Sequence, residues 1–365
     1  MKKNVIIFIP SIEGGGVEKN LFLISNYLAS KIENIFLITA SKKFKKNFDK
    51  RISFITPKYN YWDSGTRKIK YFICTILLIK KIFINKNCVI FSFQANLYCV
   101  IIAKLFNVKI IIRSNSSPEG WSKNFLKNLI FKIFLKKADM TVVNSLDFKK
   151  KLYDRFNIKA KCIYNPLNVN EIIKLSNQKI KKTLYQNNGT LKLINVGRYV
   201  DQKDQLTLLK AINEIKDQVK IQLIIMGRGV KKEILKEYIN KNQLNKIVKL
   251  VNFQNNPYPL IKKSTVFILS SKYEGLPNVL LEALVLNKFV ISSDCPTGPN
   301  EILSNGKGGL LFKTSDFRNL AKKILYYINN KKICDAKLKY ARKKLYRFSL
   351  NKNLKEYFDT VNEFI

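Results

Sequence analysis

The sequence predicts an α/β protein with two doubly wound domains, each a parallel sheet with helices on both faces. Short runs of apolar and β-branched residues alternate with amphipathic helical patterns along the chain. The alternation pauses at a polar stretch between residues 165 and 190 and then starts again. The length of 365 residues also exceeds what one ordinary hydrophobic core accommodates.

The first domain is predicted over residues 1–165. Its strands are expected to be short apolar runs, because both faces of such a parallel sheet are covered. They lie at residues 4–10, 34–40, 88–93, 108–114 and 139–144. A helix is predicted at 17–30, directly after the first strand, since Val17, Leu21 and Ile24 recur at helical spacing.

The second domain is predicted over residues 166–340, after a hinge near Asn165 and a polar linker that reaches to about residue 190. Its strands are expected at 191–197, 219–227, 247–253, 265–270, 288–294 and 308–312, and its helices at 203–216, 230–241 and 277–286. Residues 341–365 are predicted to be helical, and we expect them to pack back on the first domain. Two hinged domains of this kind face each other across an interdomain cleft, and ligands bind outside the carboxyl ends of the strands.

The charge of the chain is strongly positive. Its 67 basic and 25 acidic residues give +42 at pH 7. Residues 1–165 hold 31 basic and 9 acidic residues (+22) and the remainder holds 36 and 16 (+20), so the excess spreads over both domains. A general preference for lysine accounts for this spread, and so does an anionic partner: a membrane surface, a phosphate-bearing substrate or nucleic acid.

Histidine is absent, which excludes histidine-based catalysis and histidine-ligated metals. The six cysteines form no CxxC pair, a pattern typical of small buried side chains in a reducing cytoplasm. The apolar run from Val5 to Ile9 is too short for a signal peptide. The run at 71–79 falls short of the ~20 residues that span a bilayer.

The first predicted strand is followed by the loop SIEGGGVEKN at residues 11–20. Gly15 and Gly16 would let the backbone approach a ligand closely, and the N-terminus of the following helix favours an anion. The loop matches neither GxGxxG nor the GxxxxGK[ST] pattern, so it does not by itself indicate nucleotide binding. A plain tight turn is the alternative.

Two cations follow the first strand of the second domain. In GRYVDQKDQ (197–205), Arg198 and Lys203 flank a turn that leads into a helix, after Gly197. Such a pair can hold a diphosphate, although solvated surface charges are the alternative. The next strand ends in MGRG, where the turn at Gly227 could accommodate a base or ribose.

A pair of glutamates marks the loop and helix of SSKYEGLPNVLLEAL (270–284). Glu274 follows a strand and therefore lies at the strand-end edge. Asn278 and Glu282 are four residues apart and share one helix face. Burying the Glu282 carboxylate is costly unless it is paired, so the alternatives are an internal salt bridge to a lysine and a pair of ligand hydroxyls.

These residues carry a resemblance. SSKYEGLPNVLLEAL, followed by VISSDCPTGPNEIL, resembles the donor site of family 4 glycosyltransferases, whose GT-B fold has two facing Rossmann-like domains. GRYVDQKDQLTLLKA and MGRG match at the family's spacing. The first domain matches more loosely, through GGGVEKN, ADMTVVNSLDFKKKL and YNPLN. The resemblance covers nearly the whole chain.

The resemblance implies roles for these positions. Arg198 and Lys203 would neutralise the diphosphate of a nucleotide-sugar, and Glu282 would bind ribose hydroxyls. Glu274 would contact the donor sugar. The backbone around Gly275 and Leu276 would approach that sugar. The remaining expected contacts of the nucleotide-sugar are Asn278, Gly197, Gly227, Gly15 and Gly16.

The resemblance also implies a retaining mechanism that needs no cofactor and no metal. The acceptor hydroxyl would attack from the face of the leaving group, and the departing phosphate oxygen would take its proton. Many relatives place a histidine after a first-domain strand, against the donor sugar. This chain reads IIIRSNSSPEG at 110–120, where Asn115 or Ser116 would take that place.

The acceptor side is expected in the first domain. No acidic residue lies between Ser64 and Pro118, and WSKNFLKNLIFKIFLKK (121–137) carries five lysines. Leu126, Leu129, Ile130 and Ile133 form a stripe at helical spacing, which we expect to pack on the sheet as in an ordinary helix. The charge favours docking on an anionic membrane leaflet.

The sequence thus predicts a cytoplasmic enzyme, peripheral on the inner face of the plasma membrane. It would move a hexose or N-acetylhexosamine from a UDP-sugar to a growing glycan, lipid-linked on a polyprenyl diphosphate or carried on the cell surface. One rival is a GT-B nucleotide-sugar epimerase or hydrolase. The other is a basic nucleic-acid-binding protein, but no cluster of aromatic and basic residues and no known binding module supports specific nucleic-acid binding.

Overall fold

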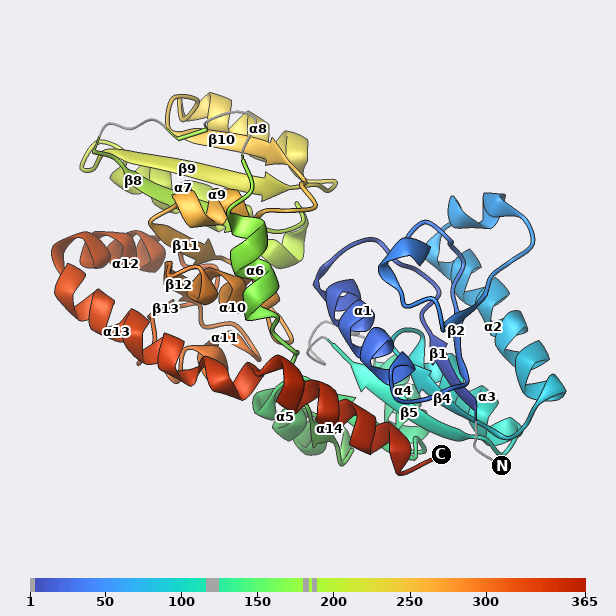
Figure 1. The fold of residues 1–365 in the computed structure, drawn as a ribbon. Coiled ribbons are helices and arrows are strands. Elements are labelled where there is room, and N and C mark those ends of the chain that lie inside the picture. The colour runs from blue at the N-terminus through green and yellow to red at the C-terminus, as the bar shows by residue number, and fades with distance from the viewer. Residues whose placement is uncertain (1–3, 116–124, 180–183, 186–188) are drawn as a thin grey trace. The chain divides into compact units, whose positions relative to one another are not determined.

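The computed structural model describes residues 4–115, 125–179, 184–185 and 189–365 (Figure 1). The chain divides into two compact units. The first unit comprises Met1–Pro166 together with Leu350–Ile365, and the second unit comprises Leu167–Ser349. The predicted boundaries at 165 and 340 differ from this division mainly at the second one, because the last helices of the second unit continue to residue 349.

The first unit contains a seven-stranded, wholly parallel sheet in the order β3-β2-β1-β4-β5-β6-β7. Its strands are β1 (Asn4–Phe8), β2 (Ile35–Ile38), β3 (Ser53–Ile55), β4 (Cys88–Ser92), β5 (Lys109–Ser114), β6 (Met140–Val143) and β7 (Lys161–Cys162). The short edge strands β3 and β7 lie outside the predicted set. From β1 the chain adds β2 and β3 on one side, and from β4 onward it adds strands on the other side of β1. The boundary between β1 and β4 is therefore the topological switch point of a Rossmann-like fold.

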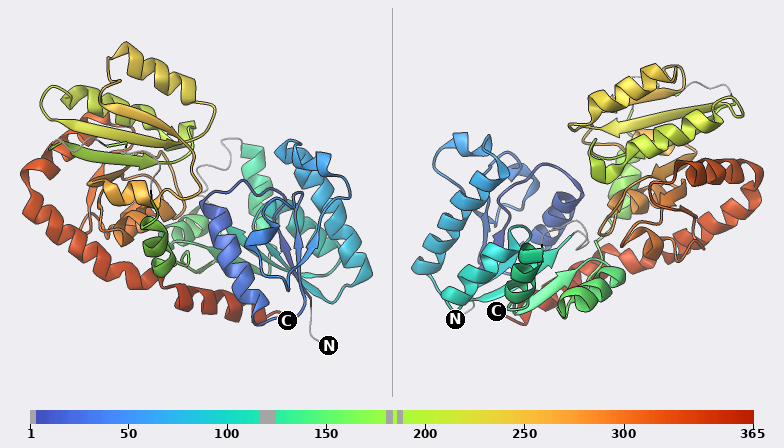
Figure 2. Two further views of the ribbon diagram at one scale, coloured as in Figure 1. Left: turned by 45° about the horizontal axis from the view of Figure 1, so that its top comes forward. Right: turned by 180° about the vertical axis from the view of Figure 1, so that it is seen from behind.

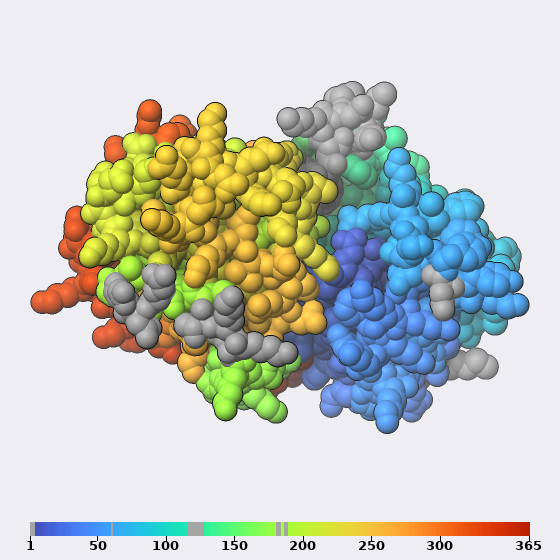
Figure 3. Space-filling model, turned by 90° about the horizontal axis from the view of Figure 1, so that it is seen from above, coloured from blue at the N-terminus to red at the C-terminus, as the bar shows by residue number. Residues whose placement is uncertain are grey.

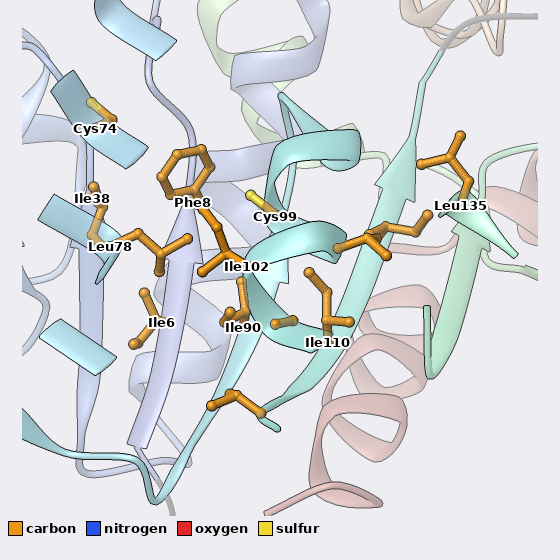
Figure 4. Close-up of a cluster of buried hydrophobic side chains, with 14 of the residues drawn as sticks. Ile6, Phe8, Ile38, Cys74, Leu78, Ile90, Cys99, Ile102, Ile110 and Leu135 are labelled. Atoms are coloured by element: carbon orange, nitrogen blue, oxygen red, sulfur yellow. The ribbon is translucent and has the colours of Figure 1, made fainter. Parts of the chain in front are cut away.

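Helices cover both faces of this sheet (Figure 2). They are α1 (Gly16–Ala29), α2 (Arg67–Ile84), α3 (Asn96–Leu105), α4 (Phe125–Leu135), α5 (Leu146–Phe156) and α14 (Leu350–Asn362), with the 3₁₀ turns η1 (Lys45–Asn47) and η2 (Asn60–Asp63). One core forms where Ile6 and Phe8 meet apolar side chains of α2, α3 and α5 (Figure 4). The other forms where Val5 and Ile7 meet α1 and α14.

The second unit repeats this architecture with a six-stranded parallel sheet in the order β10-β9-β8-β11-β12-β13. Its strands are β8 (Leu191–Val196), β9 (Ile221–Gly227), β10 (Val248–Asn252), β11 (Val266–Leu269), β12 (Phe289–Ser293) and β13 (Leu310–Phe312). The switch point lies between β8 and β11. The prediction of two doubly wound, Rossmann-like domains is confirmed; the interdomain cleft stays a prediction.

The helices of the second unit are α6 (Val169–Ser176), α7 (Gln205–Ile215), α8 (Lys232–Lys241), α9 (Tyr258–Lys263), α10 (Asn278–Val285), α11 (Pro299–Ile302), α12 (Phe317–Asn329) and α13 (Lys331–Lys343), with the 3₁₀ turns η4 (Asp201–Lys203) and η5 (Lys344–Phe348). The prediction of a linker from 165 to 190 is wrong at its start, because α6 packs against α9 and α10. The side chain of Asn168 caps this helix by accepting from the N–H of Glu171. The sequence pattern did not predict α6 because the helix has only eight residues and one buried aliphatic side chain, Ile172, which gives a weak helical periodicity.

A second correction concerns α4. The apolar stripe was expected to pack on the sheet, but Leu129, Ile130 and Ile133 are 43%, 42% and 48% exposed. Leu135 and Phe131 contact the core instead. The side chain of Leu126 lies outside the described residues. Within the described parts of the chain, no helix is both long enough and apolar enough to cross a bilayer.

Candidate functional site

The predicted site residues of the second unit gather at the switch point between β8 and β11. The turn after β8 carries Gly197, Arg198 and Lys203, and the loop after β11 carries Glu274. Parallel strands end at the same edge of a sheet, so these two segments are neighbours. The side chain of Gln202 donates to the carbonyl of Tyr273 at 2.9 Å, and the N–H of Lys272 donates to the carbonyl of Gln202 at 2.8 Å.

A short ion pair joins the two segments. Nζ of Lys203 lies 2.5 Å from Oε1 of Glu274, and the two side chains are only 16% and 8% exposed. The hydroxyl of Ser271 donates to the same carboxylate oxygen at 2.6 Å. Water screens such a pair weakly, so the ammonium and the carboxylate stabilise each other strongly. The structure therefore brings together a predicted phosphate-binding cation and the predicted sugar-binding carboxylate.

The loop after Glu274 is braced by the loop after β12. The hydroxyl of Thr297 donates to the carbonyl of Glu274 at 2.5 Å, and the N–H of Glu274 donates to the carbonyl of Pro296 at 3.3 Å. Gly298 has a φ of +83°, and a Cβ there would lie 2.2 Å from the carbonyl oxygen of Gly275. Only glycine fits, and this contact fixes the buried backbone of Gly275 and Leu276.

Gly197 and Gly227 lie at the ends of β8 and β9. A Cβ on Gly227 would lie 1.9 Å from the carbonyl oxygen of Gly197, whereas a Cβ on Gly197 would meet side-chain atoms, the methylenes of Lys203 at 3.5 Å and the amide nitrogen of Gln205 at 3.7 Å. Gly227 is therefore required by the close approach of two turns of the chain itself. A role of either glycine toward a ligand stays a prediction.

Glu282 lies on α10 and is 3% exposed. The hydroxyl of Tyr258, at the start of α9, donates to Oε1 of Glu282 at 3.1 Å. Asn278 begins α10 one turn earlier and is half-buried. Pro277, expected as the first helical residue, instead caps the helix in an extended conformation.

Arg198 differs from Lys203 in being exposed. Its carbonyl accepts from the side chain of Gln205 at 2.9 Å. This bond fixes the backbone of Arg198 but not the position of its guanidinium group. Of the two cations predicted to hold a diphosphate, one is thus paired inside the second unit and the other extends into solvent.

In the first unit, the loop after β1 binds a carboxylate of its own chain. Glu18 is 7% exposed and accepts from the backbone N–H groups of Gly15 at 2.9 Å and Glu13 at 3.3 Å. Gly15 and Gly16 are exposed at the start of α1. Glu18 supplies negative charge that the helix end favours, and a ligand anion at this helix N-terminus stays a prediction. The room that Gly15 and Gly16 would leave for a ligand stays a prediction.

Asn115 directly follows β5 and is half-buried; its side-chain oxygen accepts from Arg113. Ser116, the other predicted substitute for histidine, lies outside the described residues. Sequence reasoning missed Glu18, Ser271, Tyr258 and Arg113. Glu18 could have been found as the acidic residue three positions after a helix cap, and Ser271 lies only three residues before Glu274. The contacts of Tyr258 with Glu282 and of Arg113 with Tyr357 join segments far apart in the sequence. Among the described residues, no group of three or more acidic or cysteine side chains could hold a metal ion.

Comparison with known proteins shows what the chain resembles. Residues 176–344 match the sequence model of the family described as "Glycosyl transferases group 1", and this span lies within the second unit. This part of the chain is therefore similar to the group 1 glycosyltransferases. An uncharacterized glycosyltransferase of Methanocaldococcus jannaschii is 35% identical over 218 residues, which is 56% of this chain and 53% of that protein. The chain thus spans about half the length of this relative.

Two relatives from Campylobacter jejuni match over most of their length. One is an N-acetylgalactosamine-N,N'-diacetylbacillosaminyl-diphospho-undecaprenol 4-alpha-N-acetylgalactosaminyltransferase, 27% identical over 85% of this chain and 86% of that protein. The other is an alpha-1,4-N-acetyl-D-galactosaminyltransferase that acts on a PP-undecaprenol glycan, 26% identical over 98% of each protein.

Solved structures show the same fold. HepE of Anabaena in complex with UDP has a TM-score of 0.76 at 17% identity, covering 99% of this chain and 100% of that one. A glycosyltransferase of Rickettsia africae has a TM-score of 0.77 at 18% identity, covering 100% and 98%. The expected GT-B fold of two Rossmann-like domains is therefore confirmed.

Proposed function

We propose that this glycosyltransferase moves a hexose or N-acetylhexosamine from a UDP-sugar to a growing glycan carried on a polyprenyl diphosphate, with retention of configuration. The observation that carries the donor site is the Lys203–Glu274 pair at the switch point of the second unit, because this edge is where Rossmann-like sheets bind nucleotides. The activities for which the two Campylobacter jejuni relatives are named support the acceptor class. HepE, which resembles this chain in fold, was crystallised with UDP, and this supports the nucleotide.

In the proposed reaction, the acceptor hydroxyl oxygen bonds to the anomeric carbon while the bond from that carbon to the diphosphate oxygen breaks. The hydroxyl proton passes to the departing phosphate oxygen, and UDP leaves. Arg198 and Lys203 would stabilise the negative charge that grows on the diphosphate, where preorganised cations contribute most. This scheme needs no protein base, no cofactor and no metal.

Glu282 and Glu274 would bind different parts of the donor, the ribose and the sugar. The buried carboxylate of Glu282, held by Tyr258, is placed on a rigid helix and would accept from ribose hydroxyls. Glu274 would accept from a sugar hydroxyl, while Lys203 and Ser271 hold its carboxylate in place. Asn278, Gly275 and Leu276 lie on the segment that joins the two glutamates.

We further propose that the first unit docks on an anionic membrane surface. On α4, the exposed stripe of Leu129, Ile130 and Ile133 adjoins the exposed Lys132 and Lys136. Apolar side chains among lysines suit the boundary between lipid headgroups and acyl chains. The light-blue segment of residues 61–72 also lies at the surface of this unit (Figure 3), where Tyr61 and Phe72 are 60% and 67% exposed.

Two experiments test these proposals. Thermal shift with UDP, GDP and ADP, in the presence of EDTA, should show stabilisation by UDP alone; a ligand at ~100 times its dissociation constant adds ~2.7 kcal/mol. Transfer from UDP-GalNAc, UDP-GlcNAc or UDP-glucose to an undecaprenyl-diphosphate-linked saccharide should follow, and Arg198→Ala should lower its rate strongly. Release of free sugar without acceptor would favour the epimerase or hydrolase rival. Steeply salt-dependent binding of RNA would favour the nucleic-acid rival.

The membrane proposal has its own test. Ile130→Glu/Ile133→Glu should abolish cosedimentation with vesicles of phosphatidylglycerol. Ile234→Glu on α8, where the isoleucine is 45% exposed, is the matched control and should leave cosedimentation unchanged. Equal losses in both variants would show that the effect is one of charge alone.

A further inference from the structure

Three aromatic side chains, Tyr59, Tyr61 and Trp62, lie together in the segment that follows β3, in or next to the 3₁₀ turn η2. Tyr59 and Tyr61 are 57% and 60% exposed. Their ring centroids are 5.8 Å apart with 20° between the planes, and those of Tyr61 and Trp62 are 4.6 Å apart. In the described part of the first unit, neither core of the sheet includes these rings. We call this group the aromatic platform, since adjoining exposed rings mark an interaction surface.

The turn that carries the aromatic platform is fixed by polar contacts. Ser41, three residues after β2, donates from its hydroxyl to Oδ2 of Asp63 at 2.7 Å. Nζ of Lys70 on α2 lies 3.5 Å from Oδ1 of the same carboxylate. These contacts join the turn to the loop after β2 and to α2. A ligand therefore meets rings whose place is largely set before it binds, which lowers the entropy cost of binding.

Carboxylates accompany the rings, although the domain is strongly positive. Asp63 directly follows Trp62, and its side chain is 41% exposed. Glu13, in the loop after β1, pairs with Arg67 at the start of α2 at 3.4 Å. Glu13 and Asp63 are two of the nine acidic residues in residues 1–165. Two carboxylates here would repel the phosphates of a lipid leaflet or of nucleic acid, unlike the lysines beside the stripe on α4.

A saccharide has the chemistry that this surface matches. One face of a pyranose ring carries C–H groups, which pack on the negatively charged face of an aromatic ring. Sugar hydroxyls donate to carboxylates, which offer about four acceptor positions each. Ser41 and Lys70 use two positions of Asp63, whose side chain still meets solvent. Exposed rings next to such an acceptor favour a neutral ligand with many hydroxyls over one that carries phosphate.

The aromatic platform lies at the edge of the first sheet. β3 is the outermost strand, and β2 separates it from β1. Two strand spacings are about 10 Å, so the platform lies away from the switch point between β1 and β4, where Rossmann-like sheets bind ligands. This place suits sugars of a glycan chain other than the one that reacts.

We propose that the aromatic platform and Asp63 form a saccharide-binding site, which holds the non-reacting part of the acceptor glycan on the first unit. This inference rests on the proposed function, which supplies the acceptor class. Tyr61 and Trp62 pack against the C–H faces of sugar rings, and Asp63 accepts hydrogen bonds from sugar hydroxyls. Lys58, whose Nζ lies 5.6 Å from the ring centroid of Tyr59, adds a hydrogen-bond donor at the rim.

Binding of free saccharides tests the site without any transfer reaction. The probes are the disaccharide GalNAc-alpha-(1->4)-GalNAc, part of the glycan named for one relative, and an oligomer of N-acetylglucosamine. In titrations followed by NMR, Tyr61→Ala/Trp62→Ala should raise the dissociation constant about tenfold or more. Tyr153→Ala on α5 is the matched control, since this tyrosine is 53% exposed, and should leave binding unchanged. Equal losses in both variants, or no binding of either probe by the wild type, would overturn the inference.

Asp63→Asn separates a saccharide from a phosphate-bearing partner. Saccharide binding should weaken, because hydrogen bonds to a charged acceptor are the stronger ones. A membrane or nucleic acid as the true partner of the rings predicts the opposite sign. Stronger cosedimentation with phosphatidylglycerol vesicles or stronger RNA binding, with saccharide binding unchanged, would overturn the inference.

Transfer kinetics connect the site with the acceptor. Tyr61→Ala/Trp62→Ala should raise KM for an undecaprenyl-diphosphate-linked oligosaccharide, while kcat and UDP affinity stay unchanged. A wild-type KM in this variant, despite its loss of saccharide binding, would overturn the acceptor role. A wild-type protein that binds the saccharides but transfers no sugar would overturn the proposed function and leave the binding site standing.

Discussion

The ammonium of Lys203 and the carboxylate of Glu274 lie 2.5 Å apart, although 71 residues separate them in the sequence. Each belongs to a different strand end, so the pair closes the switch point of the second sheet. A bound diphosphate would have to share the ammonium of Lys203 with the carboxylate of Glu274. The position of the diphosphate would therefore depend on the charge of Glu274.

Breaking this pair should destabilise the second unit. Lys203→Met leaves the buried Glu274 without its cation, and we expect the free energy of unfolding to fall by about 2 kcal/mol, below the full range for dry pairs because Lys203 retains some solvent contact. Lys203→Met/Glu274→Gln should recover part of this loss. A double-mutant cycle from urea unfolding measures the coupling; additive effects would contradict a direct interaction.

Glu282 should govern nucleotide affinity and Glu274 the transfer step. Glu282→Ala is expected to weaken UDP binding about tenfold or more, since hydrogen bonds to a charged acceptor each contribute about 1.5–3 kcal/mol. Tyr258→Phe should weaken it less, because the carboxylate remains. Glu274→Ala should lower kcat more than UDP affinity. Calorimetric titration with UDP and transfer kinetics check both; wild-type behaviour of both glutamate variants would refute the site.

Gly227→Ala should be far more harmful than Gly197→Ala. The first places a methyl group 1.9 Å from a backbone oxygen, and the second places it 3.5 Å from flexible methylenes. We expect Gly227→Ala to lower the free energy of unfolding by about 2 kcal/mol or more and to separate the turns after β8 and β9. Thermal unfolding of the two variants compares them; similar melting temperatures would contradict the predicted close contact.

Asp139 should make the first unit sensitive to acid. Burial alone would raise the pKa of Asp139, but hydrogen bonds from Lys104 at 2.9 Å, the N–H of Ile110 at 2.9 Å and Lys109 at 3.1 Å lower it below 3.8. Because the folded-state pKa lies below the unfolded-state value, the stabilisation is present above pH ~4 and is lost as pH falls through the folded-state pKa.

Asp139→Asn should therefore cost about 1 kcal/mol at pH 7 and less as the pH falls below 4. Denaturant unfolding across this range measures the difference between variant and wild type. A constant difference at all pH values would show that the carboxylate charge contributes nothing.

The cysteines should resist thiol reagents in the native protein. Burial raises the pKa of the Cys74 and Cys99 thiols to about 12, and that of Cys295 to about 12 as well. Only the thiolate reacts, so these side chains should stay unmodified at pH 8. The half-buried Cys162 should react first. Mass spectrometry after brief iodoacetamide treatment identifies the site; early labelling of Cys74 would contradict the packing between α2 and the sheet.

The sequence predicted the central strands well because buried parallel strands such as β1 and β11 are continuous apolar runs. It predicted the strand-end positions of Lys203 and Glu274 for the same reason. It could not predict that they pair, since the other 66 lysines and arginines of the chain are equally possible partners of Glu274 when only the sequence is known. Edge strands β3 and β7 are too short to show a pattern, with three and two residues.

The prediction that the α4 stripe packs on the sheet was wrong for a different reason. Helical spacing of Leu129, Ile130 and Ile133 indicates an apolar face but does not say what covers it. In the first unit, α3 and α5 already cover that face of the sheet, and Leu135 provides the inward contact.

The position of α14 in the first unit affects the order in which the protein can fold during synthesis. Leu354, Tyr357 and Val361 complete the core between α1 and the sheet, and Tyr357 completes the contacts of Arg113. The ribosome makes residues 1–166 first, but that segment lacks one layer of its own core until residues 350–361 emerge. The second unit, made from one continuous segment, can finish folding earlier. During synthesis from the N-terminus, the first unit therefore begins to form first but completes its core last.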